Sequence, residues 1–137
     1  KKKAIEYVKR NNLSKNVLFK GWMESDKILE YYKNSDIFLL PSWQEGMPNA
    51  LIEALACKLA TVTTSVGMIP DYLTHNKSSL IIKPKDEGAL NSALEKLITN
   101  SASREMISNE GYLIAKEYFS TEKSLNKLAI IIKETLN

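Results

Sequence analysis

One stretch of the chain gathers residue types that suit a charged, hydroxyl-rich ligand. It spans residues 42–57, with the sequence Ser-Trp-Gln-Glu-Gly-Met-Pro-Asn-Ala-Leu-Ile-Glu-Ala-Leu-Ala-Cys. An apolar helix is expected from Pro48 onward. The free amides of a helix start and the positive end of the helix dipole favour an anion such as pyrophosphate. Gly46 has no side chain, so a ligand can approach the backbone closely there. The pattern predicts an anion-binding turn.

Glu53 is the only charged residue between Asn49 and Cys57. Because its neighbours are Ala, Leu and Ile, we expect the helix to be covered on most sides. A carboxylate in such a place must find hydrogen-bond donors or lose several kcal/mol of solvation free energy. The vicinal hydroxyls of a ribose would supply two donors. Two other interpretations stay open: Glu53 faces water along a narrow polar stripe, or it pairs with a nearby lysine.

The elements that would position these residues alternate between short apolar strands and amphipathic helices. Strands are predicted over residues 17–19, 37–40, 60–64 and 80–82. Helices are predicted over residues 4–11, 25–33, 48–57, 87–98, 101–118 and 121–136. Ser25 or Asp26 is the candidate N-cap of the second helix. Such alternation implies βαβ units and a parallel sheet, in which ligands bind outside the carboxyl ends of the strands.

Composition limits the class of protein. The 137 residues are 44% apolar and 26% charged, which fits one globular domain over residues 1–137 and is too short for two ordinary domains. The net charge of +3 includes three lysines at the N-terminus, which are typical of a solvated helix end. No aromatic residues interleave with basic ones, so we expect no nucleic-acid partner. Cys57 is the single cysteine and there is no apolar run of membrane-spanning length or signal peptide, so we expect a cytoplasmic location.

Glu45 and Glu53, with seven residues between them, resemble the paired-glutamate motif of retaining glycosyltransferases of the GT-B fold, family four. The resemblance extends over essentially the whole chain. Its further segments are residues 17–21 (Val-Leu-Phe-Lys-Gly), 32–42, the turn at 66–71 and Tyr-Phe-Ser at 118–120.

The resemblance implies an α/β fold with a Rossmann-like parallel sheet flanked by helices, the C-terminal half of a GT-B fold truncated at its N-terminal side. It also implies an enzyme, a retaining hexosyltransferase that moves a hexose-type sugar from a nucleoside-diphosphate sugar to an acceptor in polysaccharide or glycoconjugate biosynthesis. By that match Glu45 is the catalytic residue and contacts the transferred sugar, whereas Glu53 binds the ribose hydroxyls. The other donor-binding positions carried over are the amides of Gly46, Met47, Asn49 and Ala50, near the sugar and pyrophosphate, and Lys20 and Gly21, near the base.

No cofactor or metal is expected. In the family that the chain resembles, helix N-termini and basic side chains stabilise the leaving diphosphate. No Asp-x-Asp pair is present, and a lone His75 with a lone Cys57 argues against a zinc site. The expected partners are the nucleotide-sugar donor and a glycan or lipid-linked acceptor, which would be reached through a separate N-terminal domain. The resemblance leaves open a peripheral association of the full-length enzyme with the inner face of the membrane.

Several positions depart from the family pattern. Lys58 and Ala60 stand where a glycine and then a proline usually follow the motif helix, and Met68 and Ser79 stand where glycines are common. The chain also begins after the glycine-rich strand and phosphate-contacting Arg and Lys of the family, so we expect it to be inactive alone.

Two alternatives therefore stay open: a non-catalytic nucleotide-sugar-binding or interaction module, and a different GT-B enzyme such as a nucleotide-sugar epimerase or phosphorylase.

Trp22 and Trp43 both follow predicted strands, so either could stack on a base or a sugar. Trp43, two residues before Glu45, is the better placed of the two.

Overall fold

The computed structural model describes residues 2–123, and within them the strands form one parallel sheet. The strands are β1 (Ile37–Leu40), β2 (Ala60–Thr64) and β3 (Leu80–Ile82), in the order β1-β2-β3. Ile37 pairs with Ala60, and Val62 pairs with Leu80. The predicted bounds of these strands and their parallel arrangement are confirmed. All three strands therefore end at the same edge of the sheet.

The helices agree with the predicted ones to within two residues at most ends. They are α1 (Lys2–Arg10), α2 (Ser25–Lys33), α3 (Asn49–Ala56), α4 (Ile69–Tyr72), α5 (Glu87–Thr99) and α6 (Ser101–Tyr118). The short α4 was not predicted, because the sequence around Pro70 is typical of a turn. Glu24 is the N-cap of α2 and makes no side-chain cap bond, so the expectation of Ser25 or Asp26 is wrong. The helix predicted over residues 121–136 falls largely outside the described residues.

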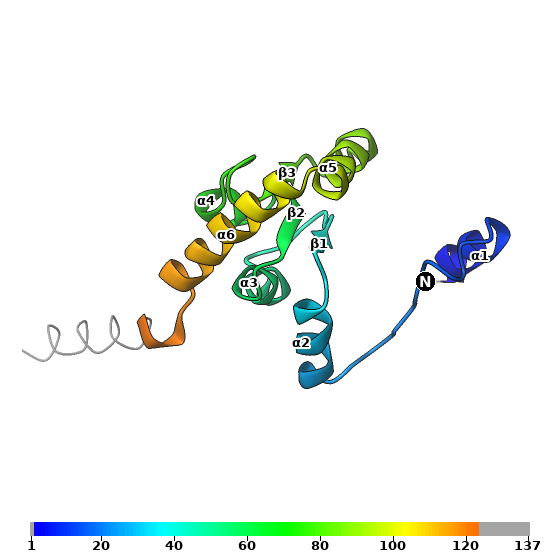
Figure 1. Ribbon diagram of the computed structural model, residues 1–137, viewed down its shortest axis with the longest axis horizontal. Helices are drawn as coiled ribbons and strands as arrows, with labels where there is room; N and C mark the ends of the chain where they lie inside the picture. The colour runs from blue at the N-terminus through cyan, green and yellow to red at the C-terminus, as the bar shows by residue number, and fades with distance from the viewer. Residues whose placement is uncertain (1, 124–137) are drawn as a thin grey trace, which may run out of the picture.

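The strand predicted over residues 17–19 is wrong. Residues 17–20 have no regular structure and are exposed, and the amide of Val17 donates to the carbonyl of Leu13 (3.0 Å) in a turn. Among residues 2–123 no strand pairs with this segment, and a strand exists only through hydrogen bonds to a neighbour. Figure 1 shows an extended connection between α1 and α2, and this connection lies apart from the sheet.

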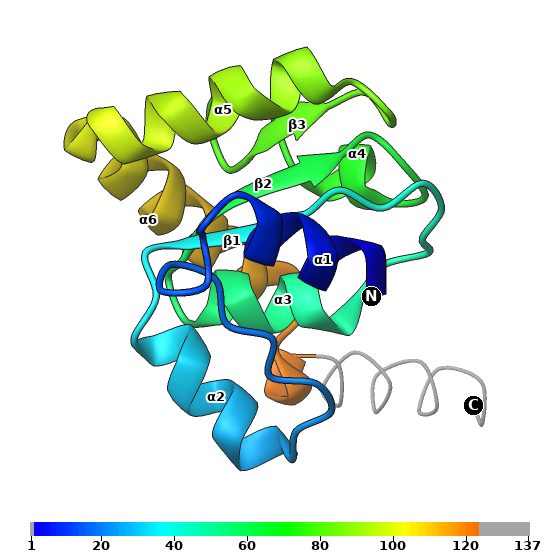
Figure 2. The same cartoon turned by 90° about the vertical axis from the view of Figure 1, so that its right-hand side faces the viewer.

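Alternate residues of the strands build two apolar clusters, one on each face of the sheet. The first contains Ala60, Val62, Leu80 and Ile82, with Ala93 and Leu97 of α5 and Ile107 of α6. The second contains Leu51 and Leu55 of α3, Ile69 and Leu73 at α4, and Ala115 of α6. Figures 1 and 2 show α5 and α3 separated by the strands. Burial of both faces is what short, continuous apolar strands require.

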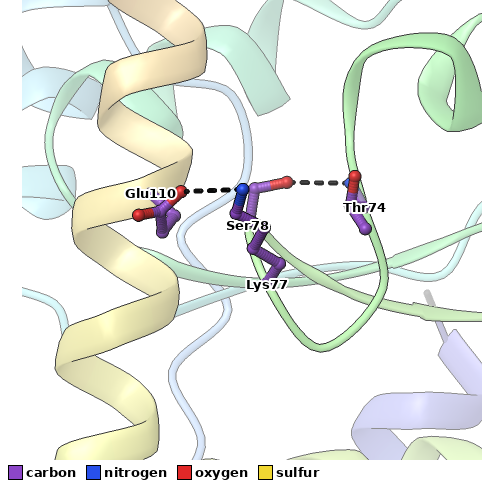
Figure 3. A network of polar contacts seen from close by, with 4 residues as sticks. All are labelled: Thr74, Lys77, Ser78 and Glu110. Carbon is purple, nitrogen blue, oxygen red and sulfur yellow. Dashed lines mark hydrogen bonds and ion pairs between the residues drawn. The ribbon is translucent and has the colours of Figure 1, made fainter.

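Helix α6 packs closely against α3 and against the loop before β3. The ammonium of Lys77 lies 3.8 Å from the carboxylate of Glu110, and the hydroxyl of Ser78 accepts a hydrogen bond from the amide of Thr74 (2.9 Å) (Figure 3). Gly111, the next residue of α6, lies against both α3 and the loop before β3. A Cβ there would lie 2.6 Å from Cδ2 of Leu55 and 3.0 Å from the carbonyl oxygen of Ser78.

We expect Gly111→Ala to destabilise the fold. Leu55 is fully buried and the oxygen belongs to the backbone, so neither gives way freely. Overpacking of this kind costs about 1–3 kcal/mol, whereas replacing a glycine inside a helix gains at most about 1 kcal/mol. Urea unfolding measures the net loss of stability.

Gly88→Ala is the matched control, since its Cβ would meet only Oδ1 of Asp86, at an ordinary 3.6 Å. This variant should be as stable as the parent or more so. Equal stability of the two alanine variants would contradict the tight packing of α6 against Leu55 and Ser78.

Candidate functional site

The turn at residues 41–48 leaves β1 at the carboxyl edge of the sheet and enters α3. The hydroxyl of Thr64, the last residue of β2, donates a hydrogen bond to the carbonyl oxygen of Ser42 (2.5 Å). The hydroxyl of Ser42 donates in turn to the carboxylate of Glu45 (2.7 Å). Strand β2 therefore holds the turn, and the turn orients the half-buried Glu45 side chain.

A second turn, at residues 65–68, presses against the first. Gly67 has a φ of +54° and lies so close that a Cβ there would be 2.2 Å from the carbonyl oxygen of Glu45 and 2.3 Å from that of Gly46. The amide of Met68 donates to the Gly46 carbonyl (3.0 Å). Only glycine fits both this backbone conformation and this spacing. Sequence reasoning placed Gly67 in a turn and missed its contact with Glu45, which depends on the neighbouring strands.

The start of α3 presents backbone N–H groups that the protein leaves unused. Among residues 2–123, the amides of Gly46, Met47, Asn49 and Ala50 donate to no acceptor. Pro48, the N-cap, is extended and has no N–H. No atom lies within 4 Å of the place where a Cβ of Gly46 would be, so the backbone there is open. Such a set of amides at a helix start can bind an anion or sugar hydroxyls.

Glu53 is exposed on one side of α3, whereas the helix positions outside that side are buried or half-buried, so the expectation that α3 is covered on most sides is confirmed. Asn49, Glu53 and Ala56 form an exposed stripe, while Leu51 and Leu55 face the core on the other side of the helix. Alanine tolerates either environment, so the alanines did not indicate which side of the helix is open. In the described part of the chain Glu53 pairs with no lysine; of the open interpretations, the exposure fits the polar stripe.

Glu53 nevertheless lines a pocket of about 370 Å³ between α2 and α3. The opposite wall comes from α2, with Ser25, Asp26 and Tyr32 among its residues, and Cys57 closes one end. Burial raises the pKa of the Tyr32 phenol above its ordinary value; the negative charge of Glu53 and the phenol's hydrogen bond to that carboxylate raise it further. The two side chains thus form a coupled pair on the pocket wall.

The structure brings some of the predicted site residues together and leaves others apart. Glu45 and the four unused amides lie in one continuous segment, the turn at residues 41–48 and the first two residues of α3. Glu53 follows one helical turn later and faces α2, in a pocket that Glu45 does not line. The ammonium of Lys20 lies over the ring of Tyr31 (5.2 Å to the centroid), and Gly21 has a φ of +73° before α2. These two predicted base-binding residues do not line the Glu53 pocket.

His75 has a local partner. Its Nδ1 accepts a hydrogen bond from the amide of Ile81 (3.0 Å).

Within residues 2–123, no three His, Cys, Asp or Glu side chains gather in a way that could hold a metal ion. None of the helices in that range combines the length and the apolar content of a membrane span.

Comparison with known proteins gives a consistent family. The family model described as glycosyl transferases group 1 matches residues 1–113. A curated relative, the capsular polysaccharide biosynthesis glycosyltransferase CapM of Staphylococcus aureus, is 30% identical over 94 residues, which cover 69% of this chain. The chain spans 25% of the length of that relative.

Solved structures share the fold. The C-terminal domain of a glycosyl transferase group 1 family protein (LpcC) from Francisella tularensis superposes with a TM-score of 0.81 and 27% identity, over 88% of this chain and 62% of that one. Anabaena Alr3699/HepE in complex with UDP gives a TM-score of 0.87 at 19% identity, over 97% of this chain and 36% of that one. These similarities confirm the α/β fold class expected from the sequence.

We expect Gly67→Ala to displace the turn that carries Glu45. The added Cβ collides with two carbonyl oxygens, and alanine at positive φ costs a further 1 kcal/mol or so, giving a loss of about 2–4 kcal/mol. Thermal unfolding measures the loss. Gly46→Ala is the control, because its Cβ would meet open space. If both variants unfold at the parent's temperature, the close contact of the two turns is wrong.

The raised pKa of Tyr32 predicts a loss of stability at alkaline pH. Below pH 10.0, the ordinary pKa, the phenol is protonated in the folded and unfolded states alike. Above it the unfolded chain ionises first, so the folded state becomes relatively less stable as pH rises toward the raised value. The difference in unfolding free energy between the parent and Tyr32→Phe should be constant below pH 10.0 and decline above it.

Urea midpoints at a series of pH values provide this difference. Glu53→Gln should reduce the decline without removing it, since burial is the larger cause. A difference that does not change with pH would contradict the described environment of Tyr32.

Proposed function

The chain belongs to the glycosyl transferases group 1 family, and from this premise we propose that it is the donor-binding part of a retaining, GT-B hexosyltransferase. The whole protein would transfer a hexose-type sugar from a nucleoside-diphosphate sugar to a glycan or lipid-linked acceptor. The name of CapM, a capsular polysaccharide biosynthesis enzyme, supports polysaccharide assembly as the setting. Location in the cytoplasm, with peripheral attachment at the membrane, is part of the same proposal.

The observation that carries this proposal is the row of unused amides at the start of α3. Gly46, Met47, Asn49 and Ala50 offer their N–H groups beside an open space, at the edge of the sheet where ligands of parallel α/β folds bind. A diphosphate would use several such donors and would gain from the helix dipole. The UDP complex of Alr3699/HepE, which shares this fold, supports a nucleotide diphosphate as the ligand.

The same amides suit the proposed chemistry. When the bond between the sugar and the diphosphate breaks, negative charge grows on the departing diphosphate. Donors already fixed by the fold stabilise that charge without reorganising, which lowers the barrier. The turn is fixed in this sense because Thr64 and Gly67 hold it from β2 and from the following loop.

The two glutamates have different roles in the proposal. Glu45 is oriented by the hydroxyl of Ser42 and lies next to the open backbone of Gly46, which suits contact with the hydroxyls of the transferred sugar. Glu53 faces the pocket beside α2, and its carboxylate can accept both hydroxyls of a ribose. Its contact with the Tyr32 phenol would be exchanged for the contact with ribose when the donor binds.

A non-catalytic nucleotide-sugar-binding module is the second candidate. The observation that favours it is the separation of the glutamates: Glu53 lines the pocket beside α2 and Glu45 does not. A module would bind the nucleotide through Glu53 and would not need Glu45 to act on a sugar.

The two candidates predict different results for the two glutamates in the full-length protein. Glu53→Gln should weaken binding of the nucleoside diphosphate by about 1–3 kcal/mol, because charge-assisted hydrogen bonds to ribose are lost. Glu45→Gln should leave that affinity nearly unchanged and reduce sugar transfer. Calorimetry with a panel of nucleotide sugars and their bare diphosphates measures the first effect, and a transfer assay measures the second.

Glu95→Gln, an exposed glutamate on α5, is the matched control and should change neither quantity. Nucleotide-diphosphate binding by the parent protein without any sugar transfer would favour the module. Normal transfer by Glu45→Gln would remove the catalytic assignment of Glu45. Unchanged diphosphate affinity in Glu53→Gln would remove the ribose assignment.

A further inference from the structure

A second pocket, of about 240 Å³, opens at the same carboxyl edge of the sheet on the side of β3. One wall is the turn after β1, with Pro41 and Trp43, and the other is the loop after β3, with Lys83 and Lys85. Thr64 at the end of β2 lies between them. This pocket does not share a residue with the pocket that Glu53 lines.

Two features of the pocket are not explained by packing. The indole of Trp43 is 70% exposed, although an indole gains much free energy from burial. The ammonium of Lys85 lies 4.6 Å from the centre of that ring, and Lys85 has a φ of +65°, an unfavourable conformation for a residue with a side chain. The backbone strain thus places a cation over an exposed aromatic face.

The rest of the lining selects among ligand classes. Pro41, Ile82 and Leu90 are apolar, Lys83 and Lys85 donate hydrogen bonds, and Glu87 accepts them. Asp86 is already used, because its carboxylate caps α5 at the amide of Ala89 (2.9 Å). An acyl chain would leave the charged groups unpaired, and a multiply charged anion would meet Glu87. A sugar ring has apolar C–H faces and hydroxyls that both donate and accept.

We propose that this pocket is a subsite for one sugar ring of the acceptor, which displaces the Lys85 ammonium from the face of Trp43, stacks there, and is hydrogen-bonded by Lys83, Lys85 and Glu87. The volume lies below that of pockets for drug-sized ligands, which suits a single ring. The assignment to the acceptor rests on the proposed function. Trp43 is two residues before Glu45, so the ring would bind to the same turn that carries the residue proposed to contact the transferred sugar, although Glu45 does not line this pocket.

Tryptophan NMR of the full-length protein tests the subsite. Isotope-labelled indole signals are assigned with Trp43→Phe and Trp22→Phe and followed during titration with methyl glucoside, methyl glucuronide, inorganic phosphate and, separately, UDP. Both glycosides should move the Trp43 signal, and phosphate should not. Trp22, 86% exposed and outside this pocket, is the matched control and should not move.

Variants then measure the individual contacts. Lys85→Ala and Glu87→Gln should each weaken glycoside binding by about tenfold, which corresponds to about 1.4 kcal/mol. Substitution of Trp43 removes the indole signal, so glycoside binding to Trp43→Phe and Trp43→Ala is measured by saturation transfer from the protein to the sugar protons. Trp43→Ala should abolish this saturation transfer.

The inference is overturned if neither glycoside moves the Trp43 signal, if Trp22 moves equally, or if phosphate alone reproduces the shift. Glycoside shifts without any UDP binding would overturn the proposed function and leave a sugar site in this pocket. UDP binding without glycoside shifts would overturn the subsite alone.

Discussion

The contact of Gly67 with the carbonyl groups of Glu45 and Gly46 is the constraint on which the site depends. These oxygens lie where a side chain at position 67 would stand, so the two turns can approach only because that side chain is absent. Because the turns lie so close, the amide of Met68 donates a hydrogen bond to the carbonyl of Gly46, and the carbonyls of the first turn face the protein. The amides of the first turn are left for a ligand. One missing Cβ thus decides which polar groups of the turn the protein uses and which it leaves available.

The parallel sheet supplies the second part of this arrangement. Its strands end together, so the turns after β1, β2 and β3 meet although they are about twenty residues apart in sequence. The buried threonines of β2 make the junction specific rather than merely apolar. The hydroxyl of Thr63 donates to the carbonyl of Leu40, the last residue of β1, and that of Thr64 donates to the carbonyl of Ser42. The Thr64 bond therefore extends the contact of β2 with this segment past the end of β1. A valine at position 64 would have a similar shape but would remove the donor to the Ser42 carbonyl oxygen.

The sequence predicted elements well where local chemistry decides them. The runs at 37–40, 60–64 and 80–82 are apolar and β-branched and lie between polar or turn residues, and each is a strand at those bounds. Residues 17–19 have the same local character, but a strand also needs a partner, which local character does not disclose. The sequence left the exposure of Glu53 open for a similar reason, since alanines do not show which face of α3 meets the core. At Lys58 tertiary structure overrides the usual residue preference. Lys58 stands at a position where the family usually has glycine, and it still adopts a φ of +59°. This conformation lets the amides of Lys58 and Leu59 donate to the carbonyls of Leu55 and Ala54 and so close the end of α3.

The two halves of the turn at residues 41–48 make different contacts. Its first half faces β3, where Trp43 lies under the Lys85 ammonium, and its second half leads into the free amides of α3. Glu45 lies between the halves, held by Ser42 from the first and joined through its carbonyl group to Gly67 of the next loop. If the amides take the diphosphate and the indole takes an acceptor ring, both substrates contact one segment that is fixed from a single strand, β2. Substrate alignment would then be a property of the sheet edge itself. Fixing both partners on a rigid element lowers the entropic cost of bringing them together, and the tight packing around Gly67 provides that rigidity.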